Sequence, residues 1–437
     1  MTECKQNFFQ FSTCKSRKVR ADFSGGRVSS DGGILFLKEL DQQLGLTKGI
    51  SNFFPDERER GKVNHSILSM FQQRIYGLCL GYKDLNDHDT LRHDVAFQTA
   101  TNRIESLASS PTLCRFEKKA TREIAYKMNK MLVEQFIQSY SEAPKELILD
   151  FDATDDRVHG NQEGRFFHGY YDHYCFLPLY VFCGDELLVS YLRPSKIDGA
   201  KHSLAILSLL VKRLRQAWPK VKIIFRADSG FCRYRIMNWC ERHDVGYILG
   251  LAKNNILKRD SENLMQKAKK LFEKRGKKSC LFKEMFYGAK TWGIKRKVIA
   301  KAEFNNLGEN LRFLVTNLSG AGKKLYKKIY VMRGDCENRI KEQQLMLFAD
   351  RTSAHRWWTN QFRLMLSSFA YVLMQAFRKK LLKDTVFFKA QVNTIRLKFL
   401  KIGAVLIRNT RKIKFKLSSV YPHQELFKKI FDRISTA

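Results

Sequence analysis

Three acidic residues lie where carboxylates could gather around divalent metal ions. Asp152 lies in LILDFDAT and Asp228 in IIFRADSGF, each at the end of a hydrophobic, strand-like run, and Glu337 lies in the charged helical segment YVMRGDCENRIKE. Such carboxylates repel one another, and two Mg²⁺ ions (or Mn²⁺ in their place) would relieve the repulsion. Two ions about 3.5–4 Å apart clamp the attacking and leaving oxygens of an in-line displacement. The pattern therefore predicts metal-dependent phosphodiester chemistry.

The first of these acids has a neighbour that could take its role. In a strand, alternation places Asp150, Asp152 and Thr154 on one face and Leu149 and Phe151 on the other. The residues alone therefore leave Asp150 and Asp152 as two candidates for the first metal ligand. An aspartate at the end of a strand can also serve only to cap a turn.

The third acid lies on a helix face with two further functional groups. Tyr330, Arg333 and Glu337 have the spacing i, i+3, i+7, which places them on one side of a helix. An arginine there can contact a phosphate with two parallel hydrogen bonds. The alternative is an ordinary solvated face that carries a salt bridge.

The charge of the chain predicts a polyanionic partner. Among 437 residues, 79 Lys and Arg stand against 43 Asp and Glu, a formal net charge of +36. The excess is local, with 21 basic against 6 acidic residues in 253–330 and 19 against 3 in 351–437. Nucleic acid is the leading candidate, and a merely basic surface is the alternative.

Nothing in the sequence indicates a membrane or an oxidising compartment. The N-terminal segment has no continuous apolar stretch, and the longest apolar runs, such as 204–211, are too short to span a bilayer. The ten cysteines form no CxxC pair, so we expect reduced thiols in a cytosolic protein. His168, His173 and Cys175 match no common zinc spacing.

Residues 1–145 are expected to form a helical N-terminal DNA-binding domain. Residues 32–46 and 63–82 have the periodicity of amphipathic helices, and Ser110-Pro111 is a start signal for a long basic helix. Short helices joined by tight turns are typical of helix-turn-helix modules. A simple helical scaffold is the alternative.

The rest of the chain has the pattern of an α/β fold. Residues 146–252 predict the order β-β-β-α-β-α-β, which is that of the first part of an RNase H-like mixed-sheet core. A β-rich basic insertion at 253–325 interrupts this core, and a helix at 326–350 returns to it with Glu337. Residues 351–437 are expected to form a basic helical C-terminal region.

These segments together resemble a known family. The chain is similar over essentially its whole length to the DDE transposases of bacterial insertion sequences, specifically the insertion-sequence 1380 family within the insertion-sequence 4-like group. The most specific pieces are LDFDATDDRVHGNQEG (149–164), FRADSGF (225–231) and YVMRGDCENRIKE (330–342).

The resemblance implies roles for particular residues. Related enzymes carry a Tyr-x2-Arg-x3-Glu-x6-Lys signature, which Tyr330, Arg333 and Glu337 match. The final lysine is absent, because position 344 is Gln, and Lys341 one turn after the glutamate is a possible substitute. The Asp-x-Thr pattern of related transposases favours Asp152 over Asp150 as the first catalytic acid.

The resemblance also implies a role for the insertion. In related hairpin-forming transposases a β-rich insertion stacks a flipped base on a tryptophan. Here Trp292 lies among basic residues, an arrangement that suits an unstacked base near phosphates. The alternative is that Trp292 packs the core of the insertion. The basic residues concerned are Lys290, Lys295, Arg296 and Lys297.

The expected function is that of a DNA transposase. It would bind terminal inverted repeats, cut at the element ends and join the freed 3′-hydroxyl to target DNA. Synapsis of two ends implies a homodimer, with Trp357 and Trp358 as candidate core or dimer contacts. The alternatives are an RNase H-like nuclease or resolvase that cuts without joining, and a transposase remnant that only binds DNA.

Overall fold

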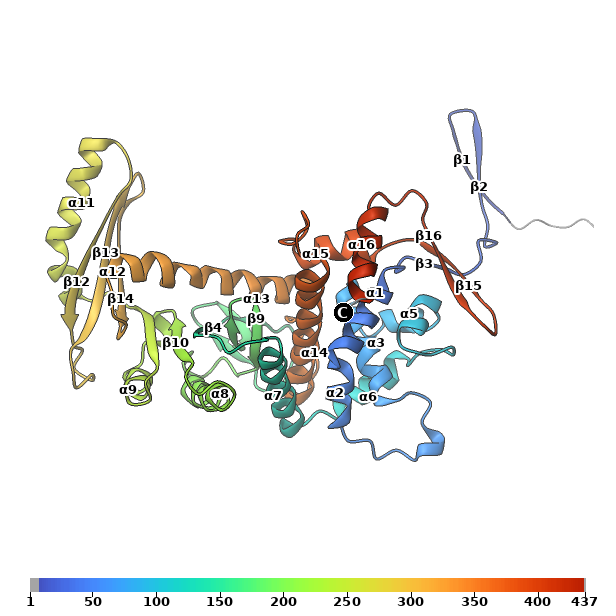
Figure 1. Cartoon of the computed structure of the whole chain (residues 1–437), viewed down its shortest axis with the longest axis horizontal. Coiled ribbons are helices and arrows are strands. Elements are labelled where there is room, and N and C mark those ends of the chain that lie inside the picture. Colours follow the sequence, from blue (N-terminus) through green and yellow to red (C-terminus); the bar gives the residue numbers. More distant parts are fainter. Residues whose placement is uncertain (1–7, 436–437) are drawn as a thin grey trace, which may run out of the picture. The chain divides into compact units, whose positions relative to one another are not determined.

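A computed structural model describes residues 8–435, and these form two compact units (Figure 1). The first unit contains residues 8–51, 55–116 and 376–435, and the second contains 52–54 and 117–375. No helix within 8–435 has the length and apolar character needed to cross a bilayer.

An eight-stranded mixed sheet forms the centre of the second unit, in the order β12-β13-β14-β11-β10-β4-β8-β9 (Figure 1). Strand β8 runs antiparallel to β4 and β9 runs antiparallel to β8, whereas β10 is parallel to β4 and β11 is parallel to β10. This order confirms the predicted α/β class with an RNase H-like core. The strands are β4 (Glu146–Ala153), β8 (Leu179–Cys183), β9 (Glu186–Tyr191), β10 (Lys222–Ala227), β11 (Gly246–Leu251), β12 (Ser279–Tyr287), β13 (Arg296–Asn305) and β14 (Gly308–Thr316).

One face of this sheet carries the larger hydrophobic core. Leu149 and Phe151 of β4 point into it, and the Phe151 ring meets Phe225 of β10 edge-on at 4.9 Å between centroids. Helices α7, α8 and α9 supply buried residues such as Val133, Leu207 and Met237 to the same cluster. The helices are α7 (Arg122–Gln138), α8 (Ser203–Ala217) and α9 (Tyr234–Arg242).

The opposite face carries Asp150 and Asp152. A continuous helical run covers it, with Leu325 and Tyr326 packed on Ile224 and Ile248 of the sheet. The run is made of α12 (Gly322–Leu325), a π turn η3 (Tyr326–Tyr330), a 3₁₀ turn η4 (Val331–Arg333) and α13 (Gly334–Leu347). Alternation along β4 thus separates its apolar side chains from its acids, as the sequence predicts.

The predicted insertion at 253–325 is β-rich, but it does not form a sheet of its own. Strand β14 pairs antiparallel with β11, so Ile248 lies opposite Thr316 and the insertion extends the central sheet. Helix α11 (Glu262–Arg275), which follows α10 (Asn255–Asp260), covers β12 and β13 through Met265 and Ala268 (Figure 1).

The predicted long helix after Ser110 is two helices. Helix α6 (Ser110–Lys118) ends, and α7 begins after Thr121, whose side-chain oxygen accepts a hydrogen bond from Ile124 N at 3.3 Å. A threonine with extended backbone is a good N-cap, and this local start signal interrupts the apolar periodicity. The boundary between the two units falls here, between residues 116 and 117.

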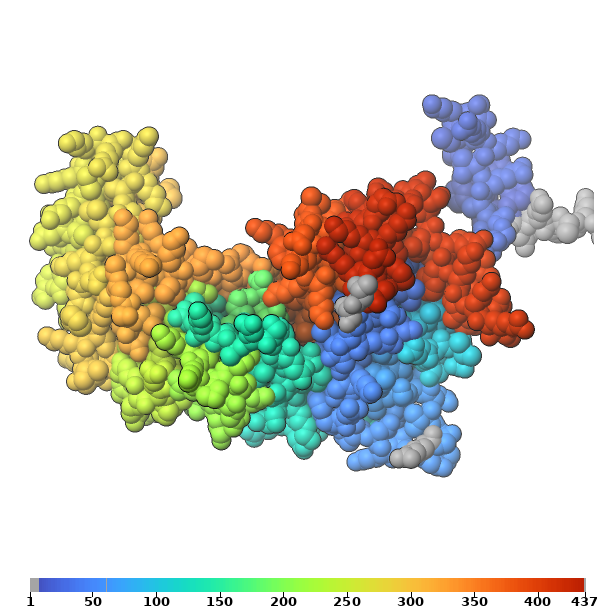
Figure 2. Space-filling view, in the orientation of Figure 1, coloured from blue at the N-terminus to red at the C-terminus, as the bar shows by residue number. Residues whose placement is uncertain are grey.

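The first unit is mainly helical but also contains two strand motifs that the sequence pattern did not predict. One is the hairpin β1–β2, all of whose side chains are exposed (Figure 2), and the other is the sheet β16-β15-β3. The strands of both motifs are only two to six residues long. The elements are β1 (Phe9–Cys14), β2 (Arg17–Ala21), β3 (Val28–Ser29), α1 (Ile34–Leu44), α2 (Leu46–Asn52), η1 (Arg60–Lys62), α3 (Ile67–Leu80), α4 (Asp87–Leu91), α5 (Val95–Ala100), η5 (Phe377–Leu381), α15 (Val392–Ile395), η6 (Arg396–Leu400), β15 (Ala404–Arg408), β16 (Ile413–Leu417) and α16 (Gln424–Ser435).

A buried ion pair joins the two strands that carry the first two acids. Asp150 lies directly opposite Arg226 in the β4–β10 register, and Arg226 Nη2 donates to Asp150 Oδ2 at 2.6 Å. Both residues are at most 5% exposed. Arg226 Nη1 also donates to the carbonyl of Ile329, in the π turn that precedes Arg333. The pair therefore fixes the helical run to the sheet.

We predict that Arg226→Leu lowers the free energy of unfolding by about 3–5 kcal/mol, because it leaves the Asp150 carboxylate buried and unpaired. Urea unfolding measures this loss. The matched control is Arg213→Leu, which breaks the half-exposed pair between Arg213 and Glu134 and should cost less than about 1 kcal/mol beyond lost packing.

The double variant Asp150→Leu, Arg226→Leu distinguishes the cost of the unpaired charge from the cost of lost packing. It should recover much of the loss, since replacing both buried partners with apolar groups removes the unpaired charge. Equal losses for Arg226→Leu and Arg213→Leu would contradict a structural role for the buried pair.

Candidate active site

The three predicted acids come from three elements of the second unit. Asp152 is the seventh residue of β4, and Asp228 directly follows β10. Because β4 and β10 are neighbouring parallel strands, their carboxyl ends lie at the same edge of the sheet. Glu337 lies in the first turn of α13, which begins directly after η4.

Each strand-end aspartate is held by the backbone. Asp152 Oδ1 accepts a hydrogen bond from Ala153 N at 2.9 Å. Asp228 Oδ1 accepts one from Gly230 N at 2.8 Å and caps the short 3₁₀ turn η2 (Ser229–Phe231). Each carboxylate therefore keeps its other oxygen for a further partner.

Electrostatics shows that the three acids act on one another. Burial raises the pKa of Asp152 to about 7, although the positive charge of Arg333 opposes the rise. The negative charges of Asp228 and Glu337 raise this pKa further. Three like charges thus share a partly buried space, which is the arrangement that a cation stabilises.

Arg333 lies between two of the acids. Its Nη1 is 3.3 Å from Asp152 Oδ2, and its Nη2 donates to Glu337 Oε1. Burial disfavours the charged guanidinium, but the carboxylates of Asp152 and Glu337 outweigh it and raise the pKa of Arg333. The arginine is therefore the cation that balances these acids within the chain.

Tyr330 lies beside this group, against the sheet. A Cβ on Gly250 of β11 would lie 2.9 Å from Tyr330 Oη and 2.7 Å from Ser229 N, so only glycine permits this close packing. Burial raises the pKa of Tyr330, with Arg333 opposing and Asp228 adding to the rise. The tyrosine is thus within electrostatic reach of both Arg333 and Asp228.

The helix that carries these groups is irregular where they lie. The π turn ends at Tyr330 and the 3₁₀ turn ends at Arg333, before regular α-helix begins at Gly334. Such changes of helical pitch are frequent at functional sites. The i, i+3, i+7 spacing predicted a regular helix face, and the change in pitch could not be read from it.

The structure separates the roles of Asp150 and Asp152. Asp150 is committed to Arg226, whereas Asp152 faces Arg333 and is acted on by Asp228 and Glu337. This placement favours Asp152 as the first acid of the site. Local sequence patterns did not identify Arg226 as the partner of Asp150, because the pair depends on strand register.

Residues that follow Glu337 along α13 differ in their availability. Lys341 is exposed. Gln344, which replaces the family lysine, donates from Nε2 to the Asp155 carbonyl at 3.1 Å and so ties α13 to the segment after β4. Gln344 therefore has a structural contact of its own.

The predicted DNA contacts of the insertion are mostly engaged within the protein. Trp292 is only 6% exposed, belongs to the main core cluster and meets Tyr287 edge-on. Arg296 is buried and pairs with Glu241 at 2.7 Å. Of these predicted residues, Lys295 is exposed and Lys297 pairs with Glu284 at 2.9 Å.

This packing corrects the expectation for Trp292. Its ring faces are covered by the core and by Arg296, whose Cζ lies 5.5 Å from the ring centroid, so neither face is open to a base in this conformation. The alternative that Trp292 packs the core of the insertion is the one that the structure supports. Trp357 likewise packs, edge-on, against Phe176.

The acids suit a hard divalent cation in chemistry, because three carboxylates supply oxygen ligands from three elements. As they stand, no group of three or more His, Cys, Asp or Glu residues within 8–435 is close enough to hold a metal ion. Arg333 would have to leave Asp152 and Glu337 before both carboxylates could take one ion together.

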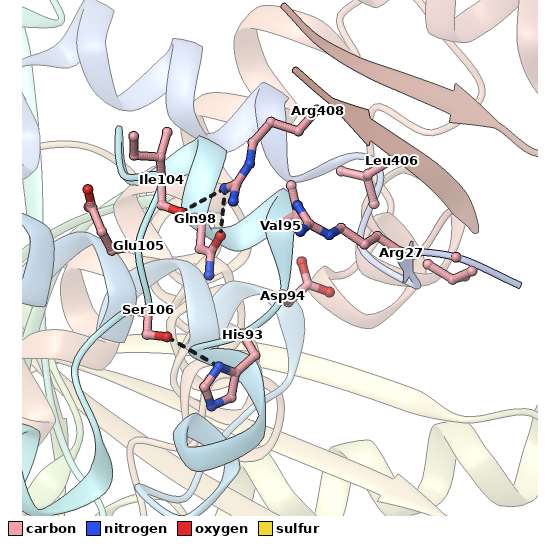
Figure 3. A pocket seen from close by; sticks show the side chains of 12 residues that line it. Arg27, His93, Asp94, Val95, Gln98, Ile104, Glu105, Ser106, Leu406 and Arg408 are labelled. Atoms are coloured by element: carbon pink, nitrogen blue, oxygen red, sulfur yellow. Dashed lines mark hydrogen bonds between the residues drawn. The ribbon is translucent and has the colours of Figure 1, made fainter. Parts of the chain in front are cut away.

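A pocket in the first unit contains none of these residues (Figure 3). Its volume is about 470 Å³. Arg408 crosses it to the Gln98 side chain and the Ile104 carbonyl, and Ser106 contacts His93. The acids in its lining are Asp94, which caps α5, and Glu105, so the pocket has no group of three acids like the site above.

We predict that the stability of the metal-free protein depends on pH through Asp152. Its pKa of about 7 in the folded state exceeds the value of about 3.9 in an unfolded chain, so the native state loses stability as pH rises through this window. Asp152→Asn has no carboxyl here to ionise, so it does not lose stability in this way. Between pH 5 and pH 8, its free energy of unfolding should therefore rise by about 2–3 kcal/mol relative to that of wild type.

Urea unfolding in a chelating buffer at several pH values measures this difference. Asp335→Asn removes an exposed carboxylate two residues before Glu337 and serves as the control. A constant difference between Asp152→Asn and wild type across this pH range would show that Asp152 is ionised throughout.

Comparison with known proteins identifies the family of the chain. No curated protein matches it. A solved structure, the synaptic complex of piggyBac transposase with hairpin DNA, is similar with a TM-score of 0.40 and 12% identity over 92% of this chain and 90% of that one. The family described as "Transposase DDE domain group 1" matches residues 11–437. The chain therefore belongs to the DDE transposase family, whose members are in general metal-dependent enzymes that cut DNA.

Proposed function

We propose that this protein is an active transposase that binds the terminal inverted repeats of an insertion sequence, cuts at the element ends and joins the 3′-hydroxyl to target DNA. The observation that carries the proposal is the group formed by Asp152, Asp228, Glu337 and Arg333. Three acids from separate elements act on one another around an arginine. The narrower assignment to the insertion-sequence 1380 family remains a prediction.

Each residue of the group has a proposed task. Asp152, Asp228 and Glu337 would hold divalent metal ions, expected to be two Mg²⁺. When bound, such ions make a water or hydroxyl nucleophilic and stabilise the leaving oxygen. Arg333, released from the acids, would donate to a phosphate of the DNA strand, and Tyr330 would lie beside that phosphate.

The deprotonation of Asp152 is part of this account. A neutral carboxyl is a poor ligand for a cation, and the pKa of Asp152 is raised to about 7 by burial. Loss of that proton would accompany metal binding, and Arg333 would exchange one anionic partner for another. The same two groups therefore connect the binding of DNA with the binding of metal.

Exposed basic residues suit the polyanionic substrate. Helix α11 buries Met265 and Ala268 against the sheet and exposes basic side chains on its other faces. A row of such side chains contacts phosphates without reading sequence. The exposed residues are Lys267, Lys269, Lys270, Lys274 and Arg275. The N-terminal region remains our candidate for recognition of the repeats, and a homodimer our candidate for synapsis.

We predict metal-dependent cutting and joining on a labelled end of the element that flanks the gene. Asp228→Asn and Glu337→Gln should each lose more than about a hundredfold in rate, because even residues outside the ligand shell of a metal cost 10–100-fold when replaced. Asp335→Asn, which removes an exposed acid from the same turn of α13, should retain activity.

Other outcomes identify the alternatives. Cutting without joining would indicate a nuclease or resolvase. Tight binding of DNA without cutting in wild type would indicate a transposase remnant, and Gln344→Lys would then test whether the absent family lysine is the cause. Equal loss in Asp335→Asn and Glu337→Gln would contradict the assigned site.

A further inference from the structure

A small three-stranded sheet follows the first acid of the site along the chain. Strand β4 ends at Ala153, and the chain then forms the three-stranded sheet β5-β7-β6. Its strands are β5 (Asp156–Arg157), β6 (Phe166–His168) and β7 (His173–Phe176). We call residues 165–174 the aromatic hairpin, because seven of these ten residues are Phe, Tyr or His.

The aromatic hairpin exposes large rings to solvent. Tyr170 is 85% exposed, Phe167 54%, Tyr174 46% and Phe166 38%. A folded protein rarely leaves several large rings together on its surface, and contiguous exposed apolar patches mark binding sites. Four such residues within nine positions therefore indicate a binding site.

The exposure is not a consequence of a loose segment. Val158 N donates to the Tyr174 carbonyl at 2.9 Å, and Ser195 Oγ donates to the Phe166 carbonyl at 2.9 Å. The loop before the hairpin is tied to the start of α14 (Trp357–Ala376), because Glu163 N donates to the His355 carbonyl and Trp357 N donates to Glu163 Oε2, each at 2.9 Å. The rings are thus presented by an anchored scaffold.

Cations lie on the exposed rings. Phe167 and Tyr174 are cross-strand partners whose rings meet edge-on at 5.7 Å, and the Arg165 guanidinium lies 4.6 Å from the Tyr174 centroid. Lys196 Nζ lies 5.4 Å from the Phe166 centroid. Rings that alternate with cations match the two parts of a single nucleic acid strand, the flat bases and the phosphates.

The aromatic hairpin is coupled to the candidate active site. His173 Nε2 is 2.9 Å from Oδ2 of Asp155, three residues after Asp152, and Gln344 of α13 donates to the Asp155 carbonyl. Tyr171 packs between the rings of His168 and His173. Burial raises the pKa of Tyr171 to about 12, and the charge of Asp152 is among the groups that add to the rise. The hairpin therefore lies within electrostatic reach of the first acid.

We propose that the aromatic hairpin stacks unpaired bases of the DNA strand that enters the candidate active site, with Phe167, Tyr170 and Tyr174 as the stacking rings and Arg165 on the adjoining phosphate. This inference rests on the proposed function. It assigns to residues 165–174 the stacking of unpaired bases that the family resemblance implied for Trp292, whose ring is buried.

Stacking at this place would serve a definite purpose. A phosphodiester in a fully paired duplex is held close to the helix, and unstacking the bases beside it costs a few kcal/mol. Rings that receive the unstacked bases offset that cost and keep the strand beside Asp152. The preference would be for unpaired over paired DNA and not for any sequence, because every base has a flat face.

The test compares two DNA probes in a chelating buffer, so that no cutting occurs. One is a duplex with a short unpaired end that carries 2-aminopurine, and the other is the same duplex fully paired. Wild type should bind the forked probe on the order of tenfold more tightly and quench its 2-aminopurine fluorescence. The double variant Phe167→Leu, Tyr170→Leu should lose the preference and the quenching, while its affinity for the paired duplex is unchanged.

The control is Tyr126→Leu, which removes an equally exposed ring (58%) from α7 and should behave as wild type. Forked-probe preference and quenching retained in the double variant would overturn the inference while the proposed function stands. If the double variant instead loses self-association and keeps its preference for the fork, the rings belong to an interface between copies and the inference is again wrong. Wild type that binds neither probe, and cuts no element end, would overturn the inference and the proposed function together.

Discussion

The candidate site depends on the repulsion among three carboxylates that share a partly buried space. Burial raises the pKa of Asp152 to about 7 against the opposing charge of Arg333, and the charges of Asp228 and Glu337 add to the rise. Within the chain, the positive charge of Arg333 reduces the repulsion among the carboxylates, because its side chain lies between Asp152 and Glu337. A divalent cation would reduce this repulsion more completely, and the arginine would then be free to bind a phosphate. Under the proposed function, a change of cation would accompany the arrival of substrate.

A second charge pair holds this arrangement in place. Asp150 and Arg226 join β4 to β10, and Arg226 also holds the Ile329 carbonyl at the turn where the helix changes pitch. The sheet therefore fixes Asp152 and Asp228 through their strands, and fixes Arg333 and Glu337 through Arg226. The aromatic hairpin leaves the same strand after Asp152, so the acids, the arginine and the exposed rings share one anchored framework.

Much of this could be predicted from the sequence, and the remainder depends on contacts between distant residues. Strand alternation in β4 and the acidic residue after β10 predicted the core and the positions of Asp152 and Asp228 at strand ends, because these are local patterns. The roles of Arg226 and of Trp292 depend on strand register and on packing, which no local spacing reveals. Thr121 begins a new helix where apolar periodicity alone would have continued the preceding one. The hairpin β1–β2 and the strands β15 and β16 were not predicted, because each strand is only five or six residues long.

The most direct test is anomalous diffraction from crystals of the protein with Mn²⁺ and an uncut DNA end. The account predicts manganese in direct contact with Asp152, Asp228 and Glu337, the Asp150–Arg226 pair intact, and Arg333 turned from the acids to a phosphate. Manganese bound elsewhere, or Arg333 still between Asp152 and Glu337 with DNA and metal present, would contradict the claim that these three carboxylates form the metal site.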